Sequence, residues 1–192
     1  QGTRRVVLKG RTQQPLLLLG YPVPGLAQPA ADDPASQDAL ALVLLAGVLD
    51  GHSAARLERT LVQGRDGVRL ADSVGAGYGL SGRGPQLFLL NAAPVAGVAP
   101  DRLEAALKAE VQRIAREGVS PAELQRVQRQ WAASEVFKRD SLFAQARELG
   151  SHWSLGWPVL AAGADCSTGA ARSPAPPSTP RMVMGLMPKI QP

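Results

Sequence analysis

The sequence has few of the residues that catalytic and disulfide-stabilised proteins use. It contains one cysteine, Cys166, and two histidines, His52 and His152, which are one hundred residues apart. A single cysteine excludes an intramolecular disulfide and leaves the redox compartment undetermined. Aromatic residues make up only 4% of the chain, so alanine, leucine and valine must fill any interior.

Long apolar runs and blocks of one charge are also absent. The longest apolar run, residues 39–49, has eleven residues, which suits a buried helix and is too short to cross a membrane. The net charge is +5, but basic and acidic residues alternate, as in Arg56–Arg59 and Glu110–Arg113, which is typical of solvated helix faces with local ion pairs. With so few aromatics to stack on bases, we predict neither a nucleic-acid partner nor a membrane span.

The composition indicates an ordinary globular protein followed by an irregular tail. The chain has 192 residues, 45% apolar and 19% charged, enough for one domain that buries roughly 70% of its unfolded surface. We expect an α+β domain over residues 1–157 and a Pro/Ala/Gly/Ser-rich tail over residues 158–192. This tail holds seven of the 16 prolines, and it looks like a truncated or frame-altered end. The first residue is Gln1, with no signal peptide, so we expect the sequence to begin inside a longer gene product.

Four segments are expected to form strands. Arg4–Lys9 and Gln14–Tyr21 have the composition of two strands joined by a short connection. Arg69–Leu80 and Pro85–Ala92 form a second pair, and Ser81-Gly-Arg-Gly84 between them is typical of a hairpin turn.

Between these pairs the sequence predicts two helices. The first has Ala39–Leu49 as its body and Ser36 or Asp38 as its N-cap. It is apolar on almost every side, so it should lie at the centre of the fold. The second is amphipathic, runs roughly from Ser53 to Val62, and turns Arg56 toward water.

Two more helices are predicted after the second strand pair. Asp101–Arg116 carries apolar residues on one stripe at helical spacing: Leu103, Leu107, Val111 and Ile114. Ser120-Pro-Ala-Glu123 is a capping box that starts a helix expected to run to about Leu149, with Gly150 as its stop. The order β-β-α-α-β-β-α-α predicts an α+β fold, with a mainly antiparallel sheet and paired helices packed on one face.

We find no pattern that predicts a reaction centre. A catalytic zinc site needs three protein ligands, and neither histidine lies in an H-x-x-E-H or H-E-x-x-H motif. His52, in a connection between helices, favours a surface or capping role, and so does His152, which follows the expected helix stop. Cys166 lies in the tail and is interpreted as an incidental thiol.

The remaining candidates also have structural interpretations. Gly75–Gly79 lacks the G-K-[ST] ending of a phosphate loop, so a strand of small residues approached closely by a helix is favoured. Asp32 and Asp33 precede a helix, where acids favour the dipole, and Glu135 and Asp140 belong to a charged helix face. We therefore predict no catalytic, cofactor-binding or metal-binding residue in this chain.

Several local strings, in their order and spacing over about residues 3 to 157, resemble one protein family. The strings are Leu19-Gly-Tyr-Pro-Val-Pro-Gly25, Asp50-Gly-His-Ser-Ala-Ala-Arg-Leu57, Leu70-Ala-Asp-Ser-Val-Gly-Ala76, Arg113-Ile-Ala-Arg-Glu-Gly-Val-Ser-Pro-Ala-Glu-Leu124 and Phe143-Ala-Gln-Ala-Arg-Glu-Leu-Gly150. They resemble the second-half domain of the pitrilysin/insulinase-type zinc metalloproteases, the inverzincins. In that family, homologous halves enclose a chamber, and one half carries H-x-x-E-H and zinc while the other lacks the motif.

The resemblance implies that this chain is the non-catalytic half and not an enzyme alone. Zinc is then expected in a homologous zinc-binding half, in the same parent polypeptide or a separate subunit, and the substrate would be a peptide or an unfolded protein. Alternatives are a scaffold or assembly subunit that keeps the fold without proteolysis, and an unrelated helical adaptor without a sheet.

The resemblance carries over no functional residue. Many active members have an Arg and a Tyr in the second half that help to bind substrate. Here Val62 and Asp72 occupy the corresponding positions, and Arg65 and Tyr78 lie nearby but out of step. The Arg- and Ala-rich composition is typical of high-GC bacteria, and relatives are often periplasmic, so we expect the periplasm of a Gram-negative bacterium.

Overall fold

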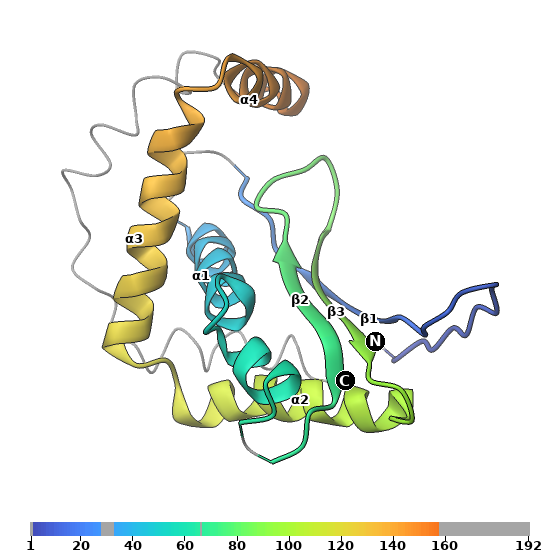
Figure 1. Ribbon diagram of the computed structural model, residues 1–192. Helices are drawn as coiled ribbons and strands as arrows, with labels where there is room; N and C mark the ends of the chain where they lie inside the picture. The colour runs from blue at the N-terminus through green and yellow to red at the C-terminus, as the bar shows by residue number, and fades with distance from the viewer. Residues whose placement is uncertain (1, 28–32, 66, 158–192) are drawn as a thin grey trace.

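The computed structural model of the chain describes residues 2–27, 33–65 and 67–157. Its elements, in chain order, are β1 (Leu17–Val23), α1 (Pro34–Asp50), a π-helical turn η1 (Glu58–Val62), β2 (Ala71–Tyr78), β3 (Gln86–Pro94), α2 (Pro100–Glu117), α3 (Pro121–Lys138) and α4 (Leu142–Leu155). The predicted α+β class is confirmed, and the helical adaptor without a sheet is excluded (Figure 1). The tail predicted over residues 158–192, with Cys166, lies outside the described residues.

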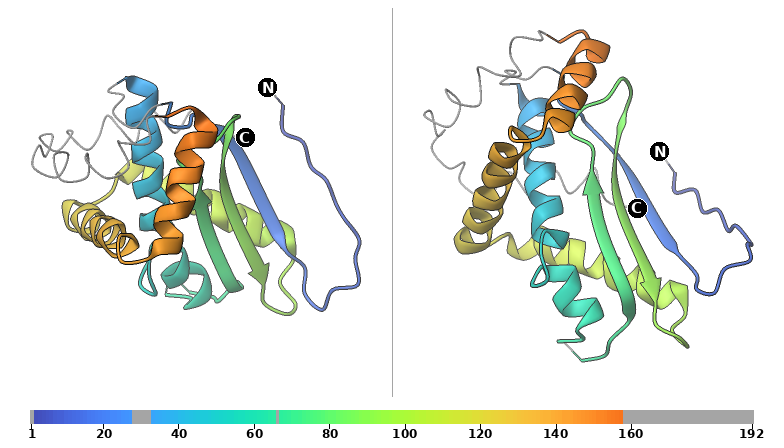
Figure 2. Two further views of the ribbon diagram at one scale, coloured as in Figure 1. Left: turned by 90° about the horizontal axis from the view of Figure 1, so that it is seen from above. Right: turned by 45° about the horizontal axis from the view of Figure 1, so that its top comes forward.

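The three strands form one antiparallel sheet in the order β1-β3-β2. Side chains alternate between its two faces, and on β3 the buried Phe88 and Leu90 point toward the helices, while Leu87 is exposed on the other face. α1, η1 and α2 supply the rest of the core, through apolar residues such as Leu42, Leu57, Leu103 and Leu107. Figure 2 shows that the opposite face of the sheet has no helix over it among the described elements.

The predicted hairpin of β2 and β3 is confirmed, but the first predicted strand is wrong. Residues 2–16 form no strand, and Val6, Val7 and Leu8 are exposed. A strand is stable only when its backbone groups are paired, and β1 pairs with β3 alone. Within residues 2–16, Arg5 forms ion pairs with Asp101 and Glu104 at the start of α2 and so connects this segment to the helices.

The second predicted strand, Gln14–Tyr21, is confirmed with shifted ends as β1. It begins at Leu17 and continues through Pro22 to Val23. Pro22 cannot donate to a ladder, but β1 lies at the edge of the sheet, where proline is tolerated.

The central helix is confirmed, although it begins earlier than predicted. Asp33 is the N-cap and accepts hydrogen bonds from the backbone N–H groups of Ala35 (2.9 Å) and Ser36 (3.1 Å), with Pro34 in the first turn. Neither Ser36 nor Asp38 is the cap; Ser36 is buried and donates its hydroxyl to Asp33. The Ser36 hydrogen bonds lower the pKa of the Asp33 carboxyl.

The second predicted helix, Ser53–Val62, is shorter than expected. Helical geometry begins only at Arg56 and becomes the π-helical turn η1. Leu57 and Leu61 face the core as predicted, but Arg56 does not face water, since its side chain is only 11% exposed.

The predicted helices at Asp101–Arg116 and Ser120 are confirmed as α2 and α3. The capping box is formed: Ser120 accepts the N–H of Glu123, and the Glu123 carboxylate accepts the N–H of Ser120. Gly118 turns the corner between the two helices with a φ of 75°, a conformation that favours glycine. α3 then packs closely on α1, where a Cβ on Gly47 would come within 2.6 Å of Val127.

The last predicted helix is two helices. α3 ends at Lys138, and the Ser141 hydroxyl accepts the N–H of Ala144 (3.2 Å) to begin α4. The stop is Gly156, in the left-handed conformation, and Gly150 lies within α4. Local capping of this kind overrides an apolar pattern that alone would permit one long helix. No helix in the described part of the chain is long and apolar enough to cross a membrane.

Candidate functional site

The two histidines lie in different parts of the molecule. His52 is in the turn after α1, where its Nδ1 accepts the backbone N–H of Ala54 (3.0 Å). His152 lies within α4, not after a helix stop, and its ring is 5.2 Å from the ring of Trp157. Within residues 2–27, 33–65 and 67–157, no group of three or more His, Cys, Asp or Glu side chains is arranged to hold a metal ion.

The positions that correspond to the substrate-binding Arg and Tyr of the resembled family have structural partners. Val62 ends η1, and Asp72 sits at an irregularity of β2, where it accepts hydrogen bonds from Arg69 (2.7 Å) and Gln14 (3.0 Å). Tyr78 donates its hydroxyl to the carbonyl of Pro24 (2.5 Å). Burial raises the pKa of Tyr78 to about 12, so this tether between β2 and the segment after β1 stays protonated near neutral pH.

The glycine-rich segment Gly75–Gly79 is a strand of small residues, as predicted. The close approach at Gly75 comes from the neighbouring strand, since a Cβ there would lie 2.5 Å from the side-chain oxygen of Asn91. The helix approaches at Ala76, whose N–H donates to the Asp50 carboxylate at the end of α1 (3.1 Å). This N–H is at the outer edge of β2, so Asp50 covers part of that edge.

A bidentate polar contact joins Arg56 to Glu123, 67 residues apart. Arg56 donates from Nε to Oε1 (3.0 Å) and from Nη2 to Oε2 (2.8 Å), and also to the carbonyl of Gly118 (3.2 Å). Such bidentate pairs are strong and directional. The hydrogen bonds from Arg56, together with those from Ser120, lower the pKa of Glu123 to about 2. We call this contact the Arg56–Glu123 pair.

The sequence does not predict this contact, because its alternating charges place Arg56 on a solvated helix face. The local pair that it predicted at Glu110–Arg113 does form, at 2.8 Å. A pair of residues distant in sequence leaves no periodic pattern. The one sequence signal at this contact is Glu123, and the capping box already accounts for that residue.

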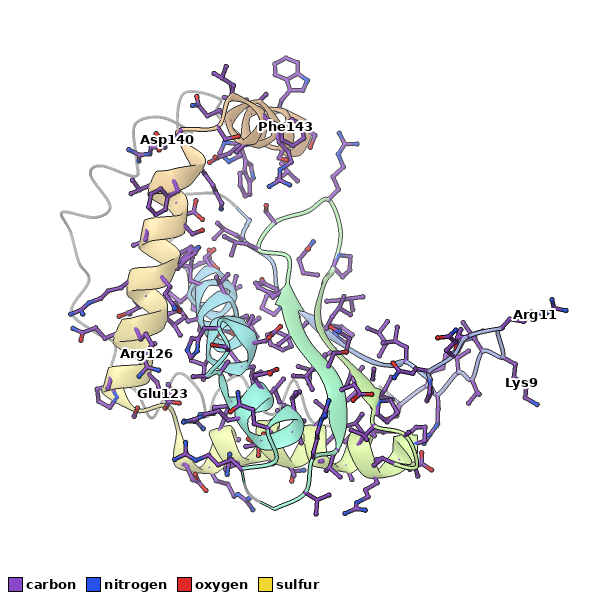
Figure 3. The ribbon with its side chains drawn as sticks, in the orientation of Figure 1. Lys9, Arg11, Glu123, Arg126, Asp140 and Phe143 are labelled. Carbon is purple, nitrogen blue, oxygen red and sulfur yellow. The ribbon has the colours of Figure 1, made fainter. Side chains whose placement is uncertain are left out.

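A polar cavity of about 360 Å³ surrounds the Arg56–Glu123 pair. It lies where the end of α1, the turn with His52, η1 and the corner between α2 and α3 meet. Its charged lining residues are Arg56, Arg59, Arg113, Glu117, Glu123 and Arg126. Figure 3 labels Glu123 and Arg126 near the start of α3, at the opposite end of this helix from Asp140 and Phe143.

A family model settles the relationship of the chain. Residues 1–131 match the Peptidase M16 inactive domain. The chain belongs to the M16 peptidase family. This match confirms the predicted pitrilysin/insulinase-type relationship, and it shows that residues 1–131 correspond to the inactive domain of that family.

Solved structures give the same M16-like fold. The inactive peptidase domain of a proposed zinc protease from Bordetella parapertussis is 19% identical, with a TM-score of 0.71, over 94% of this chain and 90% of that one. A proposed zinc protease from Bordetella pertussis Tohama I is 18% identical, with a TM-score of 0.67, over 88% and 86% of the two chains. No curated protein matches the sequence.

A third solved structure is much longer. A protease from Helicobacter pylori is 19% identical, with a TM-score of 0.62, over 77% of this chain. The aligned region is only 32% of that protein, so this chain spans about a third of its length.

Proposed function

We propose that this chain is the non-catalytic half of a zinc-dependent peptidase and completes the substrate chamber against a metal-bearing homologous half. The observation that carries the proposal is the match of residues 1–131 to the inactive M16 domain. The length of the Helicobacter pylori protease supports it, because most of that protein lies outside the part that this chain resembles.

Exposed apolar side chains support a surface that faces a partner. Phe137, at the end of α3, and Phe143 and Trp153, on α4, are each more than two-thirds exposed, at 71%, 78% and 78%. No residue of α4 is buried. Single exposed apolar residues are common, but several on neighbouring elements are typical of interaction surfaces. We call Phe137, Leu142, Phe143 and Trp153 the α4 surface.

The partner half would supply the reactive chemistry. It would be part of the same parent polypeptide or a separate subunit, and it would hold zinc through an H-x-x-E-H motif. The enclosed substrate would be a peptide or an unfolded segment of a protein. We assign no catalytic, cofactor-binding or metal-binding residue to this chain, and a periplasmic location stays a prediction.

Peptide hydrolysis by reconstituted halves tests the proposal. The purified chain with zinc should not cleave an internally quenched peptide, while addition of the metal-bearing half should produce cleavage that a chelator abolishes. The matched control is a partner half in which one histidine of H-x-x-E-H is replaced by alanine, which should bind this chain and remain inactive. Chelator-sensitive turnover by this chain alone would contradict the proposal.

A scaffold or assembly subunit is the second candidate. Val62 and Asp72 stand where active members carry the Arg and Tyr that help to bind substrate, which favours a role without direct help to catalysis. In that case the chain would co-purify with a homologous partner that lacks H-x-x-E-H, and no peptide would be cleaved by the complex.

A further inference from the structure

The polar cavity beside the Arg56–Glu123 pair gathers positive charge from three helical segments. Arg56 precedes η1, Arg59 lies in η1, Arg113 comes from α2, and Arg126 comes from α3. Side chains of arginine repel one another at close range unless anions lie between them. A cavity lined by four guanidinium groups therefore needs nearby negative charge that offsets their mutual repulsion.

Carboxylates of the chain provide part of that balance. Glu123 is committed to Arg56, and Glu110 is within 2.8 Å of Arg113. Glu117 lines the cavity from the last turn of α2, where it is exposed. Arg59 and Arg126 make no ion pair with a described carboxylate within 4.0 Å, although both line the cavity.

Of these four arginines, Arg59 has a hydrogen-bond donor that is both buried and, among the described residues, unpaired. Its Nε is buried and has no hydrogen-bond acceptor in the described part of the chain. Neighbouring Leu57 and Leu61 are fixed in the core, so η1 holds the start of the Arg59 side chain in place. A buried N–H donor without an acceptor costs free energy, and native proteins rarely leave one so.

We propose that this cavity binds a small oxyanion, the phosphate or carboxylate group of a small molecule. Arg59 would donate to it from the terminal nitrogens of its guanidinium group, and Arg126 would add charge from α3. The planar guanidinium group matches the geometry of both kinds of anion. The arginines that are already paired, Arg56 and Arg113, would be held rigidly by their carboxylates and would shape the wall.

The size of the cavity indicates the class of ligand. At about 360 Å³ it is near the lower end of the range of about 300–1,000 Å³ found for small-molecule sites. It has more room than a single inorganic anion needs, so a small organic phosphate or a polycarboxylate fits best. This binding does not depend on the proposed function, because it needs neither zinc nor a partner half.

Calorimetric titration of the full 192-residue chain tests the proposal. The probes are inorganic phosphate, pyrophosphate and citrate, each at the same ionic strength set with sodium chloride. We expect saturable binding of at least one of them. The same probe should raise the Tm of the chain in thermal denaturation. Preference for pyrophosphate would identify a phosphate site, and preference for citrate a carboxylate site; both outcomes support an oxyanion site.

Two substitutions on the same helix face give a matched control. Arg126→Gln should weaken binding about tenfold, as expected for the loss of one charge-assisted contact. Arg129→Gln removes the same charge from an exposed position of α3 outside the cavity and should leave the Kd unchanged within about twofold. Arg59→Lys keeps the charge but removes the planar guanidinium group and should weaken binding by at least as much as Arg126→Gln.

Two results would overturn the proposal. One is the absence of saturable binding for all three probes. The other is an equal loss of affinity in Arg126→Gln and Arg129→Gln, which would show that the anions respond only to the overall charge. Because Arg126 is exposed, its variant should fold even if Arg59→Lys does not, so the comparison remains decisive.

Discussion

The central helix α1 and the outer helix α4 are stabilised in different ways. α1, with 17 residues, buries Leu42 and Leu49 completely and lies against β2. α4, with 14 residues, buries none and is tied to the rest of the chain by polar contacts. Arg83 donates to the carbonyl of Ser154 (2.9 Å), and Trp157, just after the helix, donates to the carbonyl of Ala27 (2.8 Å). α1 is therefore held mainly by tertiary packing and α4 by its caps and polar contacts, and no described residue buries the apolar side chains of α4.

The largest expected difference is between two phenylalanines. Phe88 on β3 is 1% exposed and Phe143 on α4 is 78% exposed. Phe88→Ala should lower the free energy of unfolding by about 3–5 kcal/mol, because it removes buried apolar surface and leaves a cavity. Phe143→Ala should change it by less than about 0.5 kcal/mol. Urea denaturation followed by circular dichroism measures both, and similar losses would show that α4 is packed in solution.

The α4 surface should matter once the partner half is present. Phe143→Asp should weaken the complex with that half about tenfold or more, because it places a charge in an apolar contact. Gln128→Asp, on an exposed position of α3, is the control and should leave the affinity unchanged. Surface plasmon resonance with an immobilised partner half would measure both; equal affinities for the two variants would place the interface elsewhere.

The Arg56–Glu123 pair should stabilise the packed region in a pH-dependent way. The folded pKa of Glu123, about 2, is below its ordinary value of 4.5, so its stabilisation is complete above about pH 4.5 and is lost as the pH falls toward 2. A shift of this size corresponds to about 3 kcal/mol, which partial exposure of the carboxylate reduces to about 1 kcal/mol.

Glu123→Gln tests that contribution. At pH 7 it should lower the free energy of unfolding by about 1 kcal/mol, and near pH 2.5 by much less. Glu135→Gln, which removes a local ion pair with Lys138 on the same helix, should show neither effect beyond about 0.5 kcal/mol. If Glu123→Gln lowered the free energy of unfolding equally at both pH values, the charge of the carboxylate would not be the cause.

The smallest expected effects concern two serine caps. Ser120→Ala at α3 should lower the free energy of unfolding by about 1 kcal/mol, because α3 packs on α1 through the buried Val127. Ser141→Ala at α4 should leave this free energy nearly unchanged and should instead speed hydrogen exchange of the amides in the first turns of α4. Equal effects of the two substitutions on global stability would remove the distinction between the regions.

Sequence patterns predicted the parts of the fold whose signals are local. The stripe from Leu103 to Ile114 and the capping box at Ser120 each lie within one helix, and both helices form where expected. The predicted strand over residues 4–9 failed because its apolar residues say nothing about whether a partner strand is available. The break at Ser141 was missed because a serine inside an apolar pattern can face water or cap a new helix, and only the three-dimensional structure decides between them.

The candidate site was less predictable than the fold. The assignment of the chain to an inactive half came from strings spread over about residues 3 to 157, which reflect a whole domain. The cavity and the Arg56–Glu123 pair depend on η1 meeting the corner between α2 and α3. No residue spacing encodes that meeting, because it follows from how three helical segments pack.

The Asp50 contact makes the two margins of the sheet unequal. Its carboxylate occupies the outward N–H of Ala76, and the end of α1 lies against that strand, whereas the outer backbone of β1 pairs with no strand in the described part of the chain. Among the described residues, β1 is therefore the more open of the two margins for an incoming strand from another molecule. Extension of the sheet beside β1 would set both the architecture of a larger assembly and the route by which this domain would polymerise.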